Sequence, residues 1–265
     1  MAKFTCNFIS YILKRAVDIT VVIPSTTIPE VLRMEQDEKI PKKMHTKQEK
    51  YPVLYLLHGM GNNHSTWGGY SNVEMYAEER NLAVVMISGE NKSYINSSDG
   101  DRYFDFIEDE LPDFICGMFP VSSKREDTYI AGLSMGGYGA LVHGLSHPEK
   151  YAAVGAFSAP IDMMTSLLDK TGNWKKYDPR FLVENLVEKG SKLPQLYLAC
   201  GEKDQFFEDC KRFAVYLKEK EVEAEWVSFP EYKHEWRFWN MILEKYMDYI
   251  PRTDSYYQET KIRQI

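Results

Sequence analysis

The sequence predicts an α/β protein built on a doubly wound, mostly parallel sheet of about eight strands with flanking helices. Three observations predict this class. Short apolar runs that suit parallel strands buried on both faces recur along the chain. Segments of helical length and pattern separate these runs. The 265 residues, 44% of them apolar, can bury a large core, and no linker divides them, so residues 1–265 are predicted to form a single domain.

The chain is expected to open on an antiparallel pair of strands. Residues 4–10 and 16–24 both have strand character, and in the second run apolar residues alternate with Asp18 and Thr20. Residues 30–50 follow with many charges of both signs and with Pro41 in their middle. This stretch is predicted to be a solvated excursion before the next strand.

The rest of the chain alternates between strands and helices. Strands are expected at residues 52–57, 82–87, 128–131, 151–157, 195–200 and 224–229. Helices are expected at residues 73–80, 103–119, 135–146, 206–220 and 236–249. This order predicts successive β-α-β units in one sheet.

A G-x-S-x-G motif stands where the strand ending at residue 131 meets the following helix, with Ser134 flanked by Gly132 and Gly136. A turn this tight imposes a strained backbone on the serine. Only glycine at the two flanking positions leaves room for the neighbouring chain. The motif therefore predicts a serine hydroxyl held clear of the sheet, as a nucleophile requires.

A serine hydroxyl is a poor nucleophile at neutral pH, so it needs a base, and the base needs an acceptor that fixes its tautomer. In this strand–turn–helix context the acid and then the base follow the serine, each in a loop after a strand. Asp204 and His234 stand in the loops after the last two expected strands. Glu202, in the same loop as Asp204, and Asp162, after an earlier strand, are rivals for the acid. Order and placement favour Asp204 as the acid and His234 as the base.

Attack on an ester carbonyl creates an oxyanion, which backbone N–H groups must stabilise. One donor is expected from Met135, directly after the serine, and the other from the glycine-rich loop after residue 57. Met60 is the first choice in that loop and Gly61 the second. His58 precedes the serine, against the expected order, so it is predicted to be a buried, hydrogen-bonded residue that shapes the loop.

Two further groups of ionisable residues are assigned structural roles. Glu108, Asp109 and Glu110 could supply a paired acid and base, but at helical spacing they are predicted to form a solvated face. His143 and His147 lie four residues apart on one helix, but the glutamate of an H-E-x-x-H motif is missing. No metal site is predicted.

Composition excludes several classes of partner. The net charge of −7 argues against nucleic acid as the main ligand. There is no apolar run of 18 residues and no pattern of a secretory leader, so no membrane association and a cytoplasmic location are predicted. The four scattered cysteines are expected to be reduced thiols. Residues 251–265 leave two readings open, an interface of a homo-oligomer or a frayed end.

Four stretches, in this order and spacing, resemble a known family: YPVLYLLHGMGNNHSTW, IAGLSMGGYGAL, CGEKDQFFEDC and HEWRFW. They are similar to the esterase D type of α/β-hydrolase, especially its bacterial tributyrin-esterase and feruloyl- or acetyl-esterase-like members. The resemblance runs from about residue 4 to residue 250. It implies an α/β-hydrolase fold and a catalytic triad of Ser134, Asp204 and His234, with Met60 and Met135 as oxyanion donors. It also implies a small-molecule ester as substrate, without a metal or an organic cofactor.

The expected activity is that of a serine carboxylesterase acting on short-chain acyl or hydroxycinnamoyl (feruloyl) esters. S-formylglutathione hydrolases of the same family usually carry Leu-Thr-Cys after the His-Gly and a His before the serine. Met60-Gly61-Asn62 and Leu133 stand at those positions here, so the sequence favours the esterase over the thioesterase alternative without eliminating the latter. A catalytically silent binding protein is the non-enzyme alternative, but silent relatives usually lose a triad member.

Residues 160–192 form an insertion that leaves two readings open. The segment, rich in apolar residues, either forms a small cap over the pocket or packs two ordinary helices on the sheet. Met163 and Trp174 of this segment, together with Trp67, are the candidate substrate-binding residues. Trp67, Trp236 and Trp239 could also border the mouth of the pocket, although Trp236 and Trp239 are expected mainly to anchor the last helix.

Overall fold

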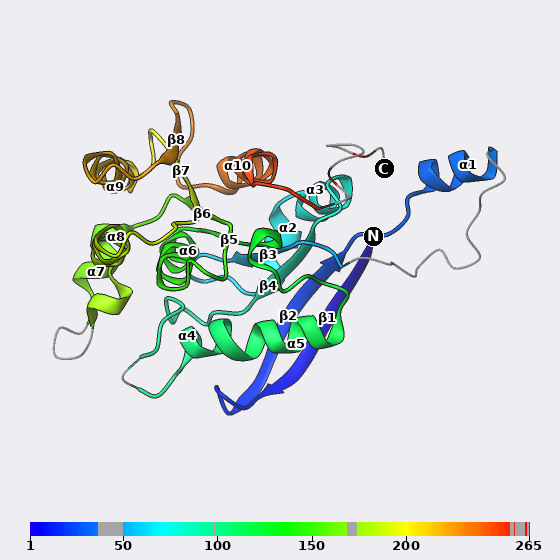
Figure 1. Cartoon of the computed structure of the whole chain (residues 1–265), viewed down its shortest axis with the longest axis horizontal. Helices are drawn as coiled ribbons and strands as arrows, with labels where there is room; N and C mark the ends of the chain where they lie inside the picture. Colours follow the sequence, from blue (N-terminus) through cyan, green and yellow to red (C-terminus); the bar gives the residue numbers. More distant parts are fainter. Residues whose placement is uncertain (37–49, 98, 169–173, 255–256, 258–262, 264) are drawn as a thin grey trace.

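The computed structural model describes residues 1–265 except 37–49, 98, 169–173, 255–256, 258–262 and 264 (Figure 1). Within these residues eight strands form one sheet in the order β1-β2-β4-β3-β5-β6-β7-β8. The strands are β1 (Ala2–Ser10), β2 (Arg15–Ile23), β3 (Val53–Leu57), β4 (Ala83–Ile87), β5 (Thr128–Leu133), β6 (Ala153–Phe157), β7 (Gln195–Gly201) and β8 (Ala224–Phe229). Strand β2 pairs antiparallel with β1 and β4, and every pair from β4 to β8 is parallel. The predicted mostly parallel sheet and its antiparallel opening are confirmed.

Helices lie on both sides of the sheet (Figure 1). They are α1 (Ile28–Gln36), α2 (Thr66–Tyr70), α3 (Val73–Glu79), α4 (Tyr103–Asp105), α5 (Leu111–Met118), α6 (Met135–Ser146), α7 (Ile161–Ser166), α8 (Pro179–Glu188), α9 (Phe207–Glu219) and α10 (Trp236–Tyr249). The bounds of α6 and α10 are those that the sequence predicts. Residues 30–36, the start of the stretch predicted to be a solvated excursion, belong to α1. Residues 37–49 of that stretch lie outside the described residues.

Side chains alternate along each central strand, so they contribute to two hydrophobic cores, one on each face of the sheet. On one face of β3, Val53, Tyr55 and Leu57 pack in a cluster that includes side chains of α5, α6, α8 and α9. On the other face, Leu54 and Leu56 pack in a cluster that includes α2, α3 and α10. All five side chains are buried, as expected for a parallel strand covered on both faces.

The order of the strands creates a crevice at the carboxyl end of the sheet. The chain passes from β3 to β4 on one side and later returns to place β5 on the other side of β3. The loops that follow β3 and β5 therefore run in opposite directions and leave space between them. This is the position at which a doubly wound sheet binds its ligand.

The helical segment predicted at 103–119 is continuous but irregular. A π-helical turn at Phe106–Glu110 joins α4 to α5 and ends two residues before Pro112, which has no N–H to donate. The prediction that residues 108–110 form one solvated face is wrong. Asp109 is exposed, but the turn directs Glu108 into the protein, where it is buried.

Glu108 is the centre of a buried polar cluster. Its carboxylate lies 2.6 Å from Nδ1 of His143, accepts a hydrogen bond of 3.0 Å from Lys150 and another of 3.2 Å from the hydroxyl of Tyr151. Burial by itself would raise the pKa of Glu108, but the hydrogen bond with His143 and the positive charge of Lys150 lower it below its usual value. His143 thus has the structural role predicted for it, and no cluster of potential metal ligands is found among the described residues.

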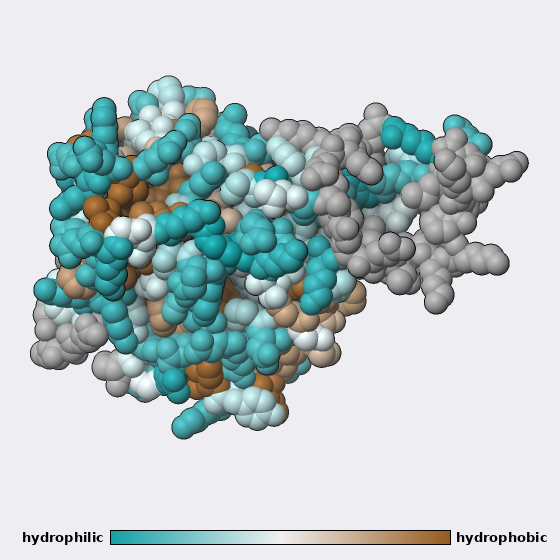
Figure 2. Space-filling model, in the orientation of Figure 1, coloured by the Kyte–Doolittle hydropathy of each residue, from teal (hydrophilic) through white to brown (hydrophobic). Residues whose placement is uncertain are grey.

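The outer surface is mainly hydrophilic in the view of Figure 2, and its apolar patches are small and separate, one of them near α8 and α9. In the described part of the chain, none of the helices has the length and apolar character needed to cross a bilayer.

The first prediction concerns the buried carboxylate. Glu108→Gln keeps the size of the side chain but leaves Lys150 and His143 without their ionised partner. We expect the free energy of unfolding at pH 7 to fall by about 3 kcal/mol, measured by urea denaturation.

The pH dependence of this loss is the control. Because the pKa of Glu108 is lower in the folded than in the unfolded state, its stabilisation is present above the unfolded-state pKa and disappears as the pH falls through the folded-state pKa. The difference between wild type and variant should therefore narrow in acid. A variant as stable as wild type at pH 7 would contradict the prediction.

Candidate active site

Ser134 occupies the turn between β5 and α6 with a backbone conformation that non-glycine residues rarely adopt, φ 52° and ψ −121°. The glycines of the motif make this turn fit against β3. A Cβ on Gly136 would lie 2.5 Å from the carbonyl oxygen of Leu57 and 2.6 Å from that of His58, and a Cβ on Gly132 would collide with Gly136. The N–H of Ser134 donates to the carbonyl of Phe157 on β6, which holds the turn against the next strand.

The three residues predicted to form a triad lie together. Nε2 of His234 is 3.1 Å from Oγ of Ser134, and Nδ1 of His234 is 2.9 Å from Oδ2 of Asp204. With Nδ1 donating to the carboxylate, Nε2 is free to accept the proton of the serine hydroxyl. The loops after β5, β7 and β8 thus bring into one hydrogen-bonded chain three side chains that are far apart in the sequence.

Asp204 is fixed and ionised. Its side chain is fully buried, and Oδ1 accepts a hydrogen bond of 2.9 Å from the N–H of Phe206. Burial would raise the pKa of Asp204, but the hydrogen bonds with His234, the Phe206 N–H and Ser158 lower it below its usual value. A buried carboxylate that keeps its charge can orient the imidazole and stabilise its protonated form.

The rival acids are engaged elsewhere. Glu202 accepts a hydrogen bond from Ser228 on β8. Asp162 forms ion pairs of 2.9 Å with Arg180 and 3.0 Å with Arg212. Neither carboxylate has a contact with His234 within the described residues, so the structure separates the favoured acid from both alternatives.

Two backbone N–H groups beside the serine are open to a ligand. Met60 and Met135 both line the hollow that contains Ser134, and no hydrogen bond from either N–H is formed within the described residues. The N–H of Gly61, the second choice for the oxyanion donor, is already bound to Oδ1 of Asn91 at 2.7 Å. The geometry therefore favours Met60 over Gly61.

His58 has the buried position predicted for it. Its Nε2 accepts a hydrogen bond of 2.8 Å from the N–H of Gly89, so its proton is on Nδ1, which donates to the carbonyl of Gly59 at 2.7 Å. Burial lowers the pKa of His58, and the imidazole is therefore held neutral. Both nitrogens are occupied, so this histidine is not available as a base.

Comparisons with known proteins identify the family of this chain. A family described as putative esterase matches residues 36–247. The chain belongs to this esterase family. Among curated relatives, an acetyl esterase of Caldicellulosiruptor saccharolyticus is 27% identical over 278 residues, which cover 96% of this chain and all of that protein.

Two solved structures from Staphylococcus aureus show the same fold as this esterase-family chain. A fluorophosphonate-binding serine hydrolase has a TM-score of 0.82 and an S-formylglutathione hydrolase one of 0.79. Each is 26% identical, and each alignment covers 95% of this chain and 99% of the other. The predictions of an α/β-hydrolase fold and of an ester-hydrolysing serine hydrolase are confirmed.

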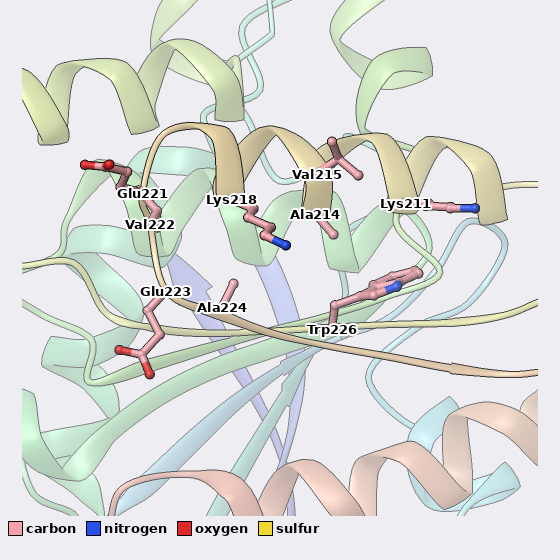
Figure 3. A pocket seen from close by; sticks show the side chains of 9 residues that line it. All are labelled: Lys211, Ala214, Val215, Lys218, Glu221, Val222, Glu223, Ala224 and Trp226. Atoms are coloured by element: carbon pink, nitrogen blue, oxygen red, sulfur yellow. The ribbon is translucent and has the colours of Figure 1, made fainter.

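The hollow at the site of this esterase-family chain is small. It has a volume of about 350 Å³ and its lining is predominantly apolar. The residues that line it are Gly59, Met60, Asn62, Leu133, Ser134, Met135, Pro160, Met163, Met164, Gln205, Phe206, His234, Trp236 and Trp239. A larger hollow of about 590 Å³ lies between α9 and β8, where Trp226 and Ala214 face each other, and it contains no member of the triad (Figure 3).

The candidate substrate-binding residues have different positions. Met163 lines the hollow, but Trp67 does not, and the expectation that it borders the mouth is wrong. Trp67 is fully buried because its indole N–H donates to the carbonyl of Leu57 and its ring packs edge-on against Trp236. Trp174 begins the short 3₁₀ helix Trp174–Tyr177 and is not among the lining residues either.

Part of the lining was missed in the sequence. Gln205 and Phe206 line the hollow and were not predicted to do so. Their position directly after Asp204, the predicted acid, could have indicated this role. Trp236 and Trp239 were not missed: they belong to α10 and also line the hollow, which was the second role considered for them. In the segment 160–192, α7 contributes Met163 and Met164 to the hollow, whereas α8 packs on α6.

The second prediction tests the contact between the serine turn and β3. Gly136→Ala places a methyl group against two backbone carbonyls that cannot move independently of β3. We expect kcat/KM for a short-chain ester to fall by about a hundredfold, because displacements near 1 Å at a reacting centre have costs of that order.

Gly117→Ala is the matched control. A Cβ at Gly117 of α5 meets nothing within 4 Å. The control should leave kcat/KM unchanged and raise the free energy of unfolding by up to about 1 kcal/mol, because alanine favours the helix. A Gly136→Ala enzyme with the wild-type rate would show that the close approach is not required.

Proposed function

We propose that the protein is a serine carboxylesterase in which Ser134 is the nucleophile, His234 the general base and Asp204 the acid that orients it. The observation that carries the proposal is the chain of hydrogen bonds from Ser134 through His234 to Asp204, next to two open N–H groups. A silent binding protein would need none of these groups to be aligned. The complete triad therefore supports catalysis rather than binding alone.

The reaction follows from these positions. His234 removes the proton of Ser134 as Oγ forms a bond to the ester carbonyl carbon, and the carbonyl oxygen becomes an oxyanion between the N–H groups of Met60 and Met135. The tetrahedral intermediate expels the alcohol, which takes the proton from His234, and an acyl-enzyme remains. Water then loses its proton to His234 and attacks the acyl-enzyme, and Ser134 regains a proton as the carboxylic acid leaves.

The size of the hollow supports a small acyl group. A volume of about 350 Å³ is near the lower end of ordinary ligand pockets. Met163 and Met164 on one side and Trp236 on the other offer flexible and flat apolar surfaces. We propose short-chain acyl esters as the main substrates, with hydroxycinnamoyl esters as the aromatic alternative.

The lining gives less support to a glutathione thioester. Glutathione carries two carboxylates, which are usually bound by arginine or lysine. Asn62 and Gln205 supply polar groups, but none of the residues that line the described hollow is cationic. The thioesterase alternative therefore depends on cations outside this hollow.

Two further predictions from the sequence remain proposals. A cytoplasmic location is compatible with four free cysteines, because oxidising compartments favour disulfides. Assembly into a homo-oligomer, one of the two interpretations of residues 251–265, is the other proposal.

The third prediction is a labelling experiment on purified protein. A fluorophosphonate probe should label wild type, because the probe reacts with activated serine hydroxyls and leaves its phosphorus on Oγ. Ser134→Ala should lose both labelling and hydrolysis of p-nitrophenyl acetate, butyrate and octanoate. In wild type the rate should be highest for the two shorter chains.

Ser228→Ala is the matched control, since it removes another partly buried serine hydroxyl, which donates to Glu202. It should keep both labelling and turnover. Labelling of Ser134→Ala at the wild-type rate would refute the proposed nucleophile. A faster reaction with S-formylglutathione than with each oxygen ester would replace the proposed substrate class by the thioester alternative.

A further inference from the structure

The loop after β4 has an unusual backbone. Glu90, Asn91, Ser93 and Tyr94 all have positive φ angles, of 42°, 57°, 54° and 61°. Such conformations are costly for residues with side chains, and a tyrosine rarely adopts one. They persist only when surrounding contacts determine the backbone. The triad and the oxyanion donors do not account for this strain.

The surrounding contacts are centred on Tyr94, whose side chain is fully buried. Two glycines make room for its ring, since a Cβ on Gly139 would lie 2.7 Å from Cδ2 of Tyr94 and a Cβ on Gly89 would collide with the ring. The carbonyl of Tyr94 accepts a hydrogen bond of 2.8 Å from Nε2 of His143, which is anchored by Glu108. The loop is therefore held rigidly at Tyr94.

From this position the loop reaches the backbone on both sides of Met60. The hydroxyl of Tyr94 donates to the carbonyl of His58 at 2.8 Å. Oδ1 of Asn91 accepts the N–H of Gly61 at 2.7 Å. The residues that precede and follow Met60 in the chain are thus attached to the same strained loop.

The link to Met60 itself passes through His58. Gly89 donates its N–H to Nε2 of His58, which leaves the proton on Nδ1, and Nδ1 donates to the carbonyl of Gly59. That carbonyl and the N–H of Met60 belong to one planar trans peptide and point in opposite directions. Holding the Gly59 oxygen therefore fixes the direction in which the Met60 N–H points.

We propose that the loop at 89–94 is a positioning device for the oxyanion donor: Tyr94, Asn91 and the tautomer of His58 together aim the Met60 N–H. This inference rests on the proposed esterase function. None of the three side chains touches the reacting atoms, so they act through the peptide between Gly59 and Met60. Their effect should be on transition-state binding and not on substrate binding.

The test uses two variants of the full chain and one control. Tyr94→Phe removes only the hydroxyl that binds the His58 carbonyl. Asn91→Gly removes the acceptor of the Gly61 N–H while tolerating the positive φ, and because Asn91 is exposed the substitution leaves the packing of the core intact. Tyr246→Phe removes another buried hydroxyl that donates to a carbonyl, that of Ile130, away from the loop.

Three quantities are measured for each protein: kcat and KM for p-nitrophenyl acetate, and the inhibition constant of phenylboronic acid. The boronic acid forms a tetrahedral adduct on Ser134 and places an oxygen at the oxyanion position. We expect both variants to lose about tenfold in kcat and to raise the boronate inhibition constant by the same factor, with KM changed less than about twofold. Tyr246→Phe should change none of these values.

Urea unfolding separates positioning from a merely structural role. If the variants lose stability but keep wild-type kcat and boronate inhibition, the proposal is overturned. It is also overturned if KM rises while kcat stays constant. If Tyr94→Phe does not fold, the kcat and boronate inhibition of Asn91→Gly decide whether the proposal stands. Failure of the proposed function would be recognised separately, because wild type itself would then neither hydrolyse the ester nor bind the boronate covalently.

Discussion

The close approach of the serine turn to the end of β3 is the constraint on which the rest of the site depends. Gly136 lies where any side chain would collide with the carbonyls of Leu57 and His58. Because this contact is possible only without a Cβ, the start of α6 lies directly against the loop that carries Met60. The strained Ser134 is then held beside that loop. One backbone contact thus places Ser134 next to the open N–H groups of Met60 and Met135.

The topology of the sheet supplies the other components. The strand order changes direction at β3, so the loops after β3 and β5 enclose the crevice, while β7 and β8 lie on the far side of β6 and deliver Asp204 and His234 to the same edge. Behind the crevice, the cluster around Glu108 holds His143, and His143 holds the backbone of Tyr94. Buried polar contacts therefore connect the helix with the π-helical turn to the active-site loops.

Local patterns in the sequence predicted most of this arrangement. The G-x-S-x-G motif determines its own turn, and Asp204 and His234 follow the next strands in the expected order, so the hydrogen-bonded group of Ser134, His234 and Asp204 could be predicted from the sequence. The burial of Glu108 was not predicted because this residue lies in a π-helical turn. Side chains in such a turn do not follow the regular 3.6-residue spacing on which the prediction relied. Trp67 was misjudged because aromatic residues beside a pocket and beneath it have the same sequence pattern. The links from Asn91 and Tyr94 to the β3 loop span 30 and 36 residues and depend on two strands being neighbours, which no local signal encodes.

The pH dependence of fluorophosphonate labelling tests the central claim most directly, since it reports the reactivity of the serine without substrate binding or product release. If an uncharged His234 must take the proton of Ser134, the second-order rate constant should fall about tenfold for each pH unit on the acid side. Asp204 should remain ionised over that range, because its pKa lies below the usual value. A rate constant that stays flat into acid would contradict the account, because the serine would then be reactive without the histidine.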